Sequence, residues 1–220
     1  MEDKDKLLKD LSRNFGRIST STISDALDRL GIRGILSGFH SISTGAKVIG
    51  TAMTVKELSG DLGEYSLEDF RIGEVIDSAE SGDVIILDNG GRKISNWGYL
   101  ASLAAKLKGI RGVIVHGGVR DVEEIRRLNF PVFAEHIVPI SGKTRIKIES
   151  INIPIEIRDV KITLGDLVVA DGTGIAIIPQ GECRRVLQEA EHLEELERVL
   201  VSRVKRGASL SELSRKYKHM

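Results

Sequence analysis

One stretch of the chain decides the fold: residues 112–127, Gly112-Val-Ile-Val-His-Gly-Gly-Val-Arg-Asp-Val-Glu-Glu-Ile-Arg-Arg. The apolar run 113–115 predicts a buried strand, two glycines follow it, and residues 122–128 have the pattern of a helix. A cation and an anion, Arg120 and Asp121, stand between strand and helix. In open α/β sheets, ligands bind beyond the carboxyl ends of strands, next to helix N-termini. The stretch therefore predicts an α/β fold in which Arg120 and Asp121 could together hold a small anion and a metal.

A second segment lies upstream and opens the helix that leads into this strand: Asn96-Trp97-Gly98-Tyr99-Leu100-Ala101-Ser102. The free backbone N–H groups of residues 98–101 and the helix dipole would favour an anion there. Along the predicted helix 100–107, apolar residues fall on one face: Leu100, Leu103, Ala104 and Leu107. The two segments together predict one site built from neighbouring strand and helix ends.

The rest of the chain alternates strands and helices up to residue 140 and is then rich in strands up to residue 180. Further strands are predicted at 46–55, 84–87, 131–134, 145–148, 151–157, 167–170 and 175–178. Further helices are predicted at 3–13, 20–31, 67–78 and 182–206. No linker or low-complexity segment divides the sequence. We therefore expect one domain over residues 1–220, with an N-terminal helix within 1–19 and a C-terminal helical region over 182–220.

Composition excludes several classes of protein. The 32 basic and 32 acidic residues balance, so there is no electrostatic reason to expect nucleic-acid binding. No apolar run approaches the roughly 20 residues that span a bilayer, and the charged start lacks a signal-peptide stretch. We expect a cytoplasmic protein without a membrane partner. The single cysteine, Cys183, excludes an internal disulfide, and its amphipathic surroundings favour a packing role.

The two motifs carry a family resemblance. Residues 118–121 resemble the Gly-Val-Arg-Asp signature of the RraA-like family, and residues 97–101 resemble the Trp-Gly-acidic-Leu-Leu segment that precedes it. The resemblance continues in order over roughly residues 20 to 200. That family includes 4-hydroxy-4-methyl-2-oxoglutarate and 4-carboxy-4-hydroxy-2-oxoadipate aldolases, and a bacterial protein that inhibits a ribonuclease. It implies a layered ββα fold of the swivelling type, in the α/β class, and a homotrimer or hexamer with sites at subunit boundaries.

The resemblance also implies roles for particular residues. The substrate, the pyruvate part of a 2-oxo acid, would be bound by Gly98, Tyr99, Leu100, Ala101 and Arg120. Asp121 would bind a divalent metal, and Arg120 and Asp121 together would be the catalytic pair. Arginine suits a planar carboxylate because its guanidinium group makes two parallel hydrogen bonds. A single carboxylate with waters suits Mg²⁺ or Mn²⁺ better than zinc. The implied activity is that of a class II aldolase, and the enolate it forms also arises when oxaloacetate loses carbon dioxide.

The sequence departs from the family pattern at two positions. Tyr99 stands where the aldolases have an acidic residue that orients water at the metal, and a phenol is a poor base near pH 7. His116 stands where the family often has Asp. It could carry protons at the site, although a strand-end histidine satisfied by its neighbours is the favoured interpretation.

Other interpretations of the charged residues stay open. Asp121 could simply cap the following helix and pair with Arg120, and Glu124 fits a capping box three residues on. Asp88 ends a strand whose sequence resembles residues 164–174. It either belongs to a similarly built central strand, which we favour, or borders the site. Asp61 follows a glycine, as in a Gly-Asp-Asn segment of the family, but Leu62 replaces the Asn.

Two classes of function follow. The first is a divalent-metal-dependent carbon–carbon lyase that cleaves 4-hydroxy-4-methyl-2-oxoglutarate type substrates, decarboxylates oxaloacetate, or does both, giving pyruvate. The second is a non-catalytic regulator that binds a protein partner such as a ribonuclease. A lyase or hydratase with another substrate could also use the same site.

Overall fold

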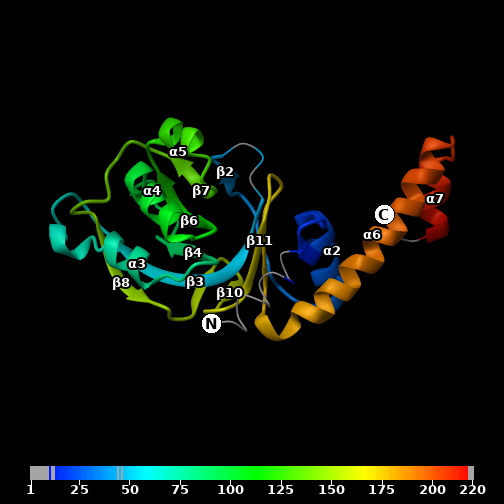
Figure 1. Ribbon diagram of the computed structural model, residues 1–220, viewed down its shortest axis with the longest axis horizontal. Coiled ribbons are helices and arrows are strands. Elements are labelled where there is room, and N and C mark those ends of the chain that lie inside the picture. Colours follow the sequence, from blue (N-terminus) through cyan, green and yellow to red (C-terminus); the bar gives the residue numbers. More distant parts are fainter. Residues whose placement is uncertain (1–9, 11–12, 44, 46, 218–220) are drawn as a thin grey trace.

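A ten-stranded mixed sheet organises the chain in the computed structural model, which describes residues 10, 13–43, 45 and 47–217 (Figure 1). Four parallel neighbours form its centre: β3 (Val48–Ser59), β4 (Asp83–Asp88), β6 (Gly112–Val119) and β7 (Val132–Ile137). All six residues of β4 are buried, as expected for a parallel strand covered on both faces. The short strand β5 (Ser95–Trp97) pairs with the last residues of β6, beyond the end of β4.

Antiparallel strands complete the sheet. On the β3 side the order continues through β11 (Leu167–Ala170), β12 (Ile175–Ile178) and β1 (Ile35–Leu36). Strand β2 (His40–Ser41) borders β7, and β8 (Ile146–Ile151) pairs with the second half of β3. A separate two-stranded ribbon consists of β9 (Ile155–Ile157) and β10 (Val160–Ile162).

Helices cover the sheet unequally. One face of the parallel strands packs against α3 (Ile72–Ser78), α4 (Tyr99–Lys108) and α5 (Val122–Leu128). The opposite face packs against the β9–β10 ribbon. Apolar side chains of α2 (Thr20–Leu30) and α6 (Cys183–Lys205) form a third core with β11 and β12. In Figure 1, α6 runs away from the sheet and ends beside α7 (Leu210–Tyr217). Single 3₁₀ turns lie at Leu67–Asp69 and Gln180–Glu182.

The layered α/β fold is therefore confirmed, and most predicted elements are present. The strands 167–170 and 175–178 are found with the predicted bounds, and the helix 20–31 ends at Gly31, which adopts the left-handed conformation. The predicted helix 3–13 lies almost entirely outside the described residues.

Several boundaries were wrong. The strand predicted at 113–115 continues through both glycines to Val119. A Cβ on Gly118 would lie 2.6 Å from a Val138 methyl group and 2.8 Å from the Ile94 carbonyl oxygen, so only glycine fits there. The predicted helix 67–78 is a 3₁₀ turn followed by α3. The predicted strand 151–157 is broken at residues 152–154, because Pro154 cannot donate to a ladder.

Candidate functional site

A hollow of about 370 Å³ lies where the two sequence motifs meet. It is enclosed by α3, by the start of α4, by β5 and by the loop that follows β7. Its lining is mostly apolar, with a few polar groups: Phe70, Ile72, Gly73, Ile76, Ser95, Asn96, Trp97, Gly98, Leu100, Ala101, Ala104, Arg120, Asp121, Ser141 and Lys143. Such a small apolar hollow with few polar groups is typical of a small-ligand site.

The motifs touch each other at Gly98. A Cβ on this residue would lie 2.6 Å from Asp121 Oδ2 and 3.3 Å from Arg120 Cγ, so a larger residue would displace both side chains. The Tyr99 backbone N–H donates a hydrogen bond to Asp121 Oδ2 at 3.1 Å. Trp97 is buried, and its indole N–H donates to Ser102 Oγ at 2.8 Å, which fixes the start of α4. The close approach explains why glycine follows tryptophan in the motif.

Arg120 and Asp121 lie side by side at the mouth of the hollow. Arg120 Nε is 3.7 Å from Asp121 Oδ2, and the two side chains are 42% and 41% exposed. Asp121 has φ 57° and ψ 39°, a left-handed backbone that costs a non-glycine residue energy and is often found at functional sites. Because both side chains are only partly paired and partly exposed, they remain able to bind a ligand.

The simple capping interpretation of Asp121 is wrong in part. Asp121 precedes α5, but its side chain makes no cap hydrogen bond to that helix. It bonds instead to the N-terminus of α4, and Glu124 pairs with Arg127 at 2.8 Å rather than closing a capping box. The predicted pairing of Asp121 with Arg120 is present.

Five of the six predicted site residues line the hollow: Gly98, Leu100, Ala101, Arg120 and Asp121. Tyr99 is the sixth, and it is not among the lining residues. Its backbone contacts Asp121, while its side chain is 37% exposed. Helix geometry leaves the N–H groups of Leu100 and Ala101 without partners inside α4, beside Arg120. The structure thus brings together an arginine, a carboxylate and a helix N-terminus.

Sequence reasoning missed part of the lining. Lys143 and Ser141 come from the loop between β7 and β8, and Phe70 comes from the turn before α3. Asn96 also lines the hollow, although the sequence motif that contains it indicates no role for its side chain. The polar sequence Ser141-Gly-Lys-Thr was a signal for a turn, but nothing in the sequence indicated that the turn faces α4.

A row of charged side chains and one histidine crosses the opposite face of the sheet. Asp88 Oδ2 is 2.6 Å from Lys56 Nζ, and Asp88 Oδ1 is 2.7 Å from His116 Nδ1. His116 Nε2 lies 3.7 Å from Glu135, which pairs with Arg158 at 2.6 Å. We call Lys56, Asp88, His116, Glu135 and Arg158 the ionic row.

His116 and Asp88 are therefore satisfied by their neighbours and do not line the hollow, as the favoured interpretations predicted. Burial opposes ionisation of Asp88, but hydrogen bonds from His116, Lys56 and the Gly90 N–H outweigh it and hold the pKa of this carboxyl below its usual value. Asp88 is thus a buried, paired carboxylate.

The remaining candidates lie elsewhere. Asp61 is exposed and lines a different hollow with Ser59, Glu64 and Arg92. Cys183 begins α6, where burial raises the pKa of its thiol to about 11, so it has little thiolate character. Neither residue lines the hollow beside Arg120.

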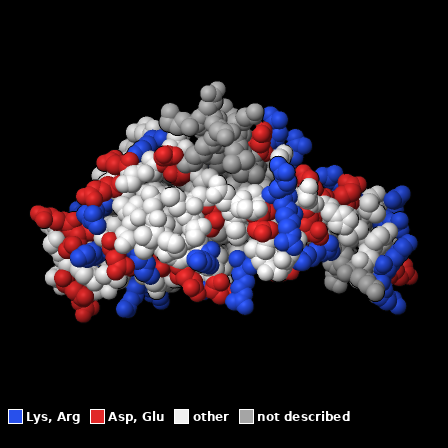
Figure 2. Space-filling model, turned by 90° about the horizontal axis from the view of Figure 1, so that it is seen from below, with Lys and Arg blue, Asp and Glu red and all other residues white. Residues whose placement is uncertain are grey.

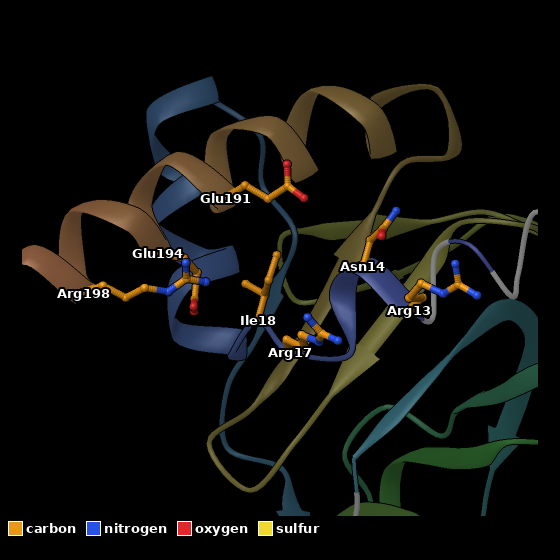
Figure 3. A pocket seen from close by; sticks show the side chains of 7 residues that line it. All are labelled: Arg13, Asn14, Arg17, Ile18, Glu191, Glu194 and Arg198. Atoms are coloured by element: carbon orange, nitrogen blue, oxygen red, sulfur yellow. The ribbon is translucent and has the colours of Figure 1, made fainter.

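Another hollow of about 370 Å³ separates the segment before α2 from α6. Figure 3 shows the side chains that line it: Arg13, Asn14, Arg17, Ile18, Glu191, Glu194 and Arg198. It mixes cations with carboxylates and contains no residue of either motif. On the face seen in Figure 2, acidic and basic side chains are likewise interspersed around a largely uncharged centre. We therefore place the candidate site in the hollow beside Arg120.

The donor set at this site fits only certain metals. Among the residues that the structure describes, no group of three or more His, Cys, Asp or Glu side chains is arranged to hold an ion. A lone, 41% exposed carboxylate such as Asp121 suits Mg²⁺ or Mn²⁺, which keep several waters, and does not suit a closed zinc site.

The fold and these contacts define a layered α/β protein with a small-ligand hollow at the carboxyl ends of its parallel strands. The RraA-like family description, Aldolase/RraA, matches residues 20–177, and the chain belongs to this family. No helix of the described part is long and apolar enough to cross a membrane.

Two relatives indicate the range of the family. The chain is 35% identical over 185 residues to a Halalkalibacterium halodurans protein named "Putative 4-hydroxy-4-methyl-2-oxoglutarate aldolase", with 83% of this chain and 82% of that one covered. It is 33% identical over 200 residues to Protein DlpA of Legionella pneumophila. That match covers 90% of this chain but only 32% of the Legionella protein, so this chain spans about a third of that relative.

Solved structures agree with the family. RraAS2 of Streptomyces coelicolor, described as an unusual member of the RNase ES inhibitor RraA protein family, has a TM-score of 0.74 at 27% identity, covering 86% of this chain and 94% of that one. A protein of Pseudomonas syringae pv. tomato has a TM-score of 0.85 at 30% identity, covering 95% and 94%. Relatives thus carry the names of both an aldolase and a ribonuclease inhibitor.

Proposed function

We propose that this protein is a divalent-metal-dependent carbon–carbon lyase that releases pyruvate from a 2-oxo acid. The observation that carries the proposal is the pairing of Arg120 and Asp121 with the α4 N-terminus at one hollow. The relatives named as 4-hydroxy-4-methyl-2-oxoglutarate aldolases support the same reaction class. The substrates are 4-hydroxy-4-methyl-2-oxoglutarate type compounds, oxaloacetate, or both.

Arg120 binds the substrate carboxylate in this scheme. Its side chain is 42% exposed at the mouth of the hollow, and only Nε lies near Asp121 Oδ2, at 3.7 Å, so donors remain for a bidentate contact. The Leu100 and Ala101 N–H groups add two backbone donors at the positive end of α4. The wall of the hollow beside these donors is mostly apolar.

Asp121 holds the metal in this scheme. The Tyr99 N–H donates one hydrogen bond to Oδ2, and the carboxylate keeps lone pairs on both oxygens with which it could hold an ion. The bound Mg²⁺ or Mn²⁺ would supply Lewis-acid stabilisation of the negative charge that develops on carbon–carbon cleavage.

Tyr99 affects which reaction runs best. Its phenol is neutral near pH 7 and lies outside the hollow lining, so it does not replace the base of the aldolases. Decarboxylation of oxaloacetate needs the carboxylate contact and the metal, but it needs less help from a base. We propose that oxaloacetate is decarboxylated more efficiently than aldol substrates are cleaved.

The apolar face of α4 suits a subunit contact. Leu100 is 76% exposed and Leu107 is 80% exposed, with Ala104 exposed between them, so the predicted apolar face of this helix points away from the core. Leu100 and Ala104 also line the hollow. We propose that this face is covered in a homotrimer or hexamer, and that a neighbouring subunit closes the site.

Pyruvate release from oxaloacetate tests the proposal. The wild-type protein should release pyruvate well above the protein-free rate with Mg²⁺, lose this activity in excess EDTA, and regain it when Mg²⁺ is restored. A rate that is the same with Mg²⁺ and with EDTA would contradict the metal role.

A regulator that binds a ribonuclease is the second candidate function. The exposed α4 face is the observation that suits it, together with the resemblance to the Streptomyces inhibitor. This second function would be favoured if the wild-type protein released no pyruvate but bound a ribonuclease, and if Leu107→Lys abolished that binding.

A further inference from the structure

A buried carboxyl group lies directly behind the candidate site. Glu57 on β3 is only 4% exposed, and Asn96 on β5 is 2% exposed. The Asn96 amide Nδ2 donates a hydrogen bond to Glu57 Oε2 at 2.5 Å. Asn96 lines the hollow two residues before Gly98, so Glu57 is connected to the site through a single hydrogen bond.

The same pair leaves two buried oxygens without partners. Within the described residues, Glu57 Oε1 and Asn96 Oδ1 are the buried side-chain nitrogen or oxygen atoms without a hydrogen bond. Both atoms are acceptors if Glu57 is ionised, so neither can satisfy the other. A proton on Glu57 Oε1 changes this, because a carboxylic acid and a primary amide can form two hydrogen bonds in one ring. One bond of that ring is already present, and the second would join the two unpartnered oxygens.

We propose that Glu57 is a positioning residue: it stays protonated, closes a two-bond acid–amide ring with Asn96, and so holds the segment that leads into Gly98. The effect on catalysis rests on the lyase function proposed above, whereas the ring itself does not.

The surroundings favour the protonated form. Burial raises the pKa of Glu57 to about 8; the Asn96 hydrogen bond lowers it, and the negative charge of Asp88 on β4 raises it. On β8 the residue opposite Glu57 is Ile148, which is apolar. The neighbouring cation, Lys56, is bonded to Asp88 in the ionic row.

The proton also links stability to pH. The native protein keeps the Glu57 proton up to about pH 8, whereas the unfolded chain releases it near pH 4.5. The native state therefore binds more protons between these values, and its stability falls as the pH rises through this window. Above about pH 8 the ring loses one bond and a buried charge appears behind Asn96.

Glu57→Gln separates the protonated role from an ionised one, because glutamine can form the same ring with Asn96 but cannot ionise. Glu57→Leu removes the ring, and Glu156→Gln on β9 is an exposed control. Infrared difference spectra at pH 7 should show a protonated carboxylic acid in the wild type that Glu57→Gln lacks and Glu156→Gln retains. The melting temperature should fall from pH 5 to pH 8 in the wild type and in Glu156→Gln, with a smaller fall in Glu57→Gln.

The activity profile tests the effect on the site. The wild-type kcat/KM for pyruvate release should fall about tenfold per pH unit above pH 8. Glu57→Gln should lose this alkaline limb, and Glu57→Leu should be slower at every pH. An ionised Glu57 at pH 7, or an alkaline limb unchanged in Glu57→Gln, would overturn the proposal. A wild type that releases no pyruvate at any pH would remove the lyase function and the catalytic half of this inference. The infrared and melting results would still decide the ring.

Discussion

The two faces of the parallel sheet carry similar charged residues that differ in how fully they are paired and buried. On one face, the ionic row pairs Asp88 with both Lys56 and His116, and the Asp88 side chain is 2% exposed. On the helix-covered face, Arg120 and Asp121 are each about two-fifths exposed and lie 3.7 Å apart. Arg120 and Asp121 follow the carboxyl end of β6, and the ionic row crosses the carboxyl halves of β3, β4, β6 and β7. Ligands are expected at this edge of the sheet.

The two groups differ in how many hydrogen-bond donors and acceptors remain unused. Every side chain in the ionic row is bonded or paired to a neighbour, so the row connects four strands of the sheet. Arg120 and Asp121 keep unused donors and acceptors beside a hollow. A position at a strand end is therefore not sufficient for ligand binding. The side chains there must also keep donors or acceptors that no neighbour uses.

The largest expected effect is from Asp121→Ala. Loss of the metal carboxylate should lower kcat/KM for pyruvate release about 1,000-fold, because Lewis-acid stabilisation is worth several kcal/mol. Steady-state kinetics across a Mg²⁺ titration measures this loss. Wild-type activity in this variant, at any Mg²⁺ concentration, would remove Asp121 from the site.

Asp88→Asn tests the other face. Removal of one buried charge partner should lower the free energy of unfolding by about 3 kcal/mol at pH 7, measured by urea denaturation. Because the pKa of Asp88 is lowered, its contribution is present above the unfolded pKa and is lost as the pH falls through the folded pKa. The deficit should therefore shrink in acid. Unchanged stability together with lost activity would reverse the two roles.

Arg120→Lys should have a smaller effect on catalysis. Lysine keeps the charge but cannot make the bidentate contact, and one charge-assisted hydrogen bond is worth about 1.5–3 kcal/mol, so kcat/KM should fall about 10–100-fold. Arg127→Lys is a matched control, since Arg127 is exposed on α5, where it pairs with Glu124, and does not line the hollow. Equal kinetics of the two variants would count against substrate contact by Arg120.

Tyr99→Asp should have the smallest effect and the opposite sign. A carboxylate at this position should raise turnover of 4-hydroxy-4-methyl-2-oxoglutarate about tenfold, a part of the 10²–10⁴-fold typical of acid–base help, and change decarboxylation little. The two substrates are compared in one coupled pyruvate assay. Strong wild-type aldol cleavage that the substitution lowers would make Tyr99 a participant.

The sequence predicted the site where local rules apply. A buried strand, glycines and a helix start bring Arg120 and Asp121 to a sheet edge, and the resemblance added the segment around Gly98. Tertiary contacts decided the rest. Periodicity predicted that Leu100 and Leu107 share one face of a helix, but it could not predict that this face is exposed to solvent. The hydrogen bond of Asp121 to α4 depends on the left-handed backbone of Asp121. Lys143 enters from a loop whose path no local pattern defines.

A crystal structure with Mn²⁺ and pyruvate tests the contrast between the two faces most directly, because the anomalous signal of manganese locates the ion. We predict a peak at the Asp121 carboxylate and a pyruvate carboxylate on Arg120, with the ionic row unchanged. A peak between Asp88, His116 and Glu135, or pyruvate bound away from Arg120, would contradict the account.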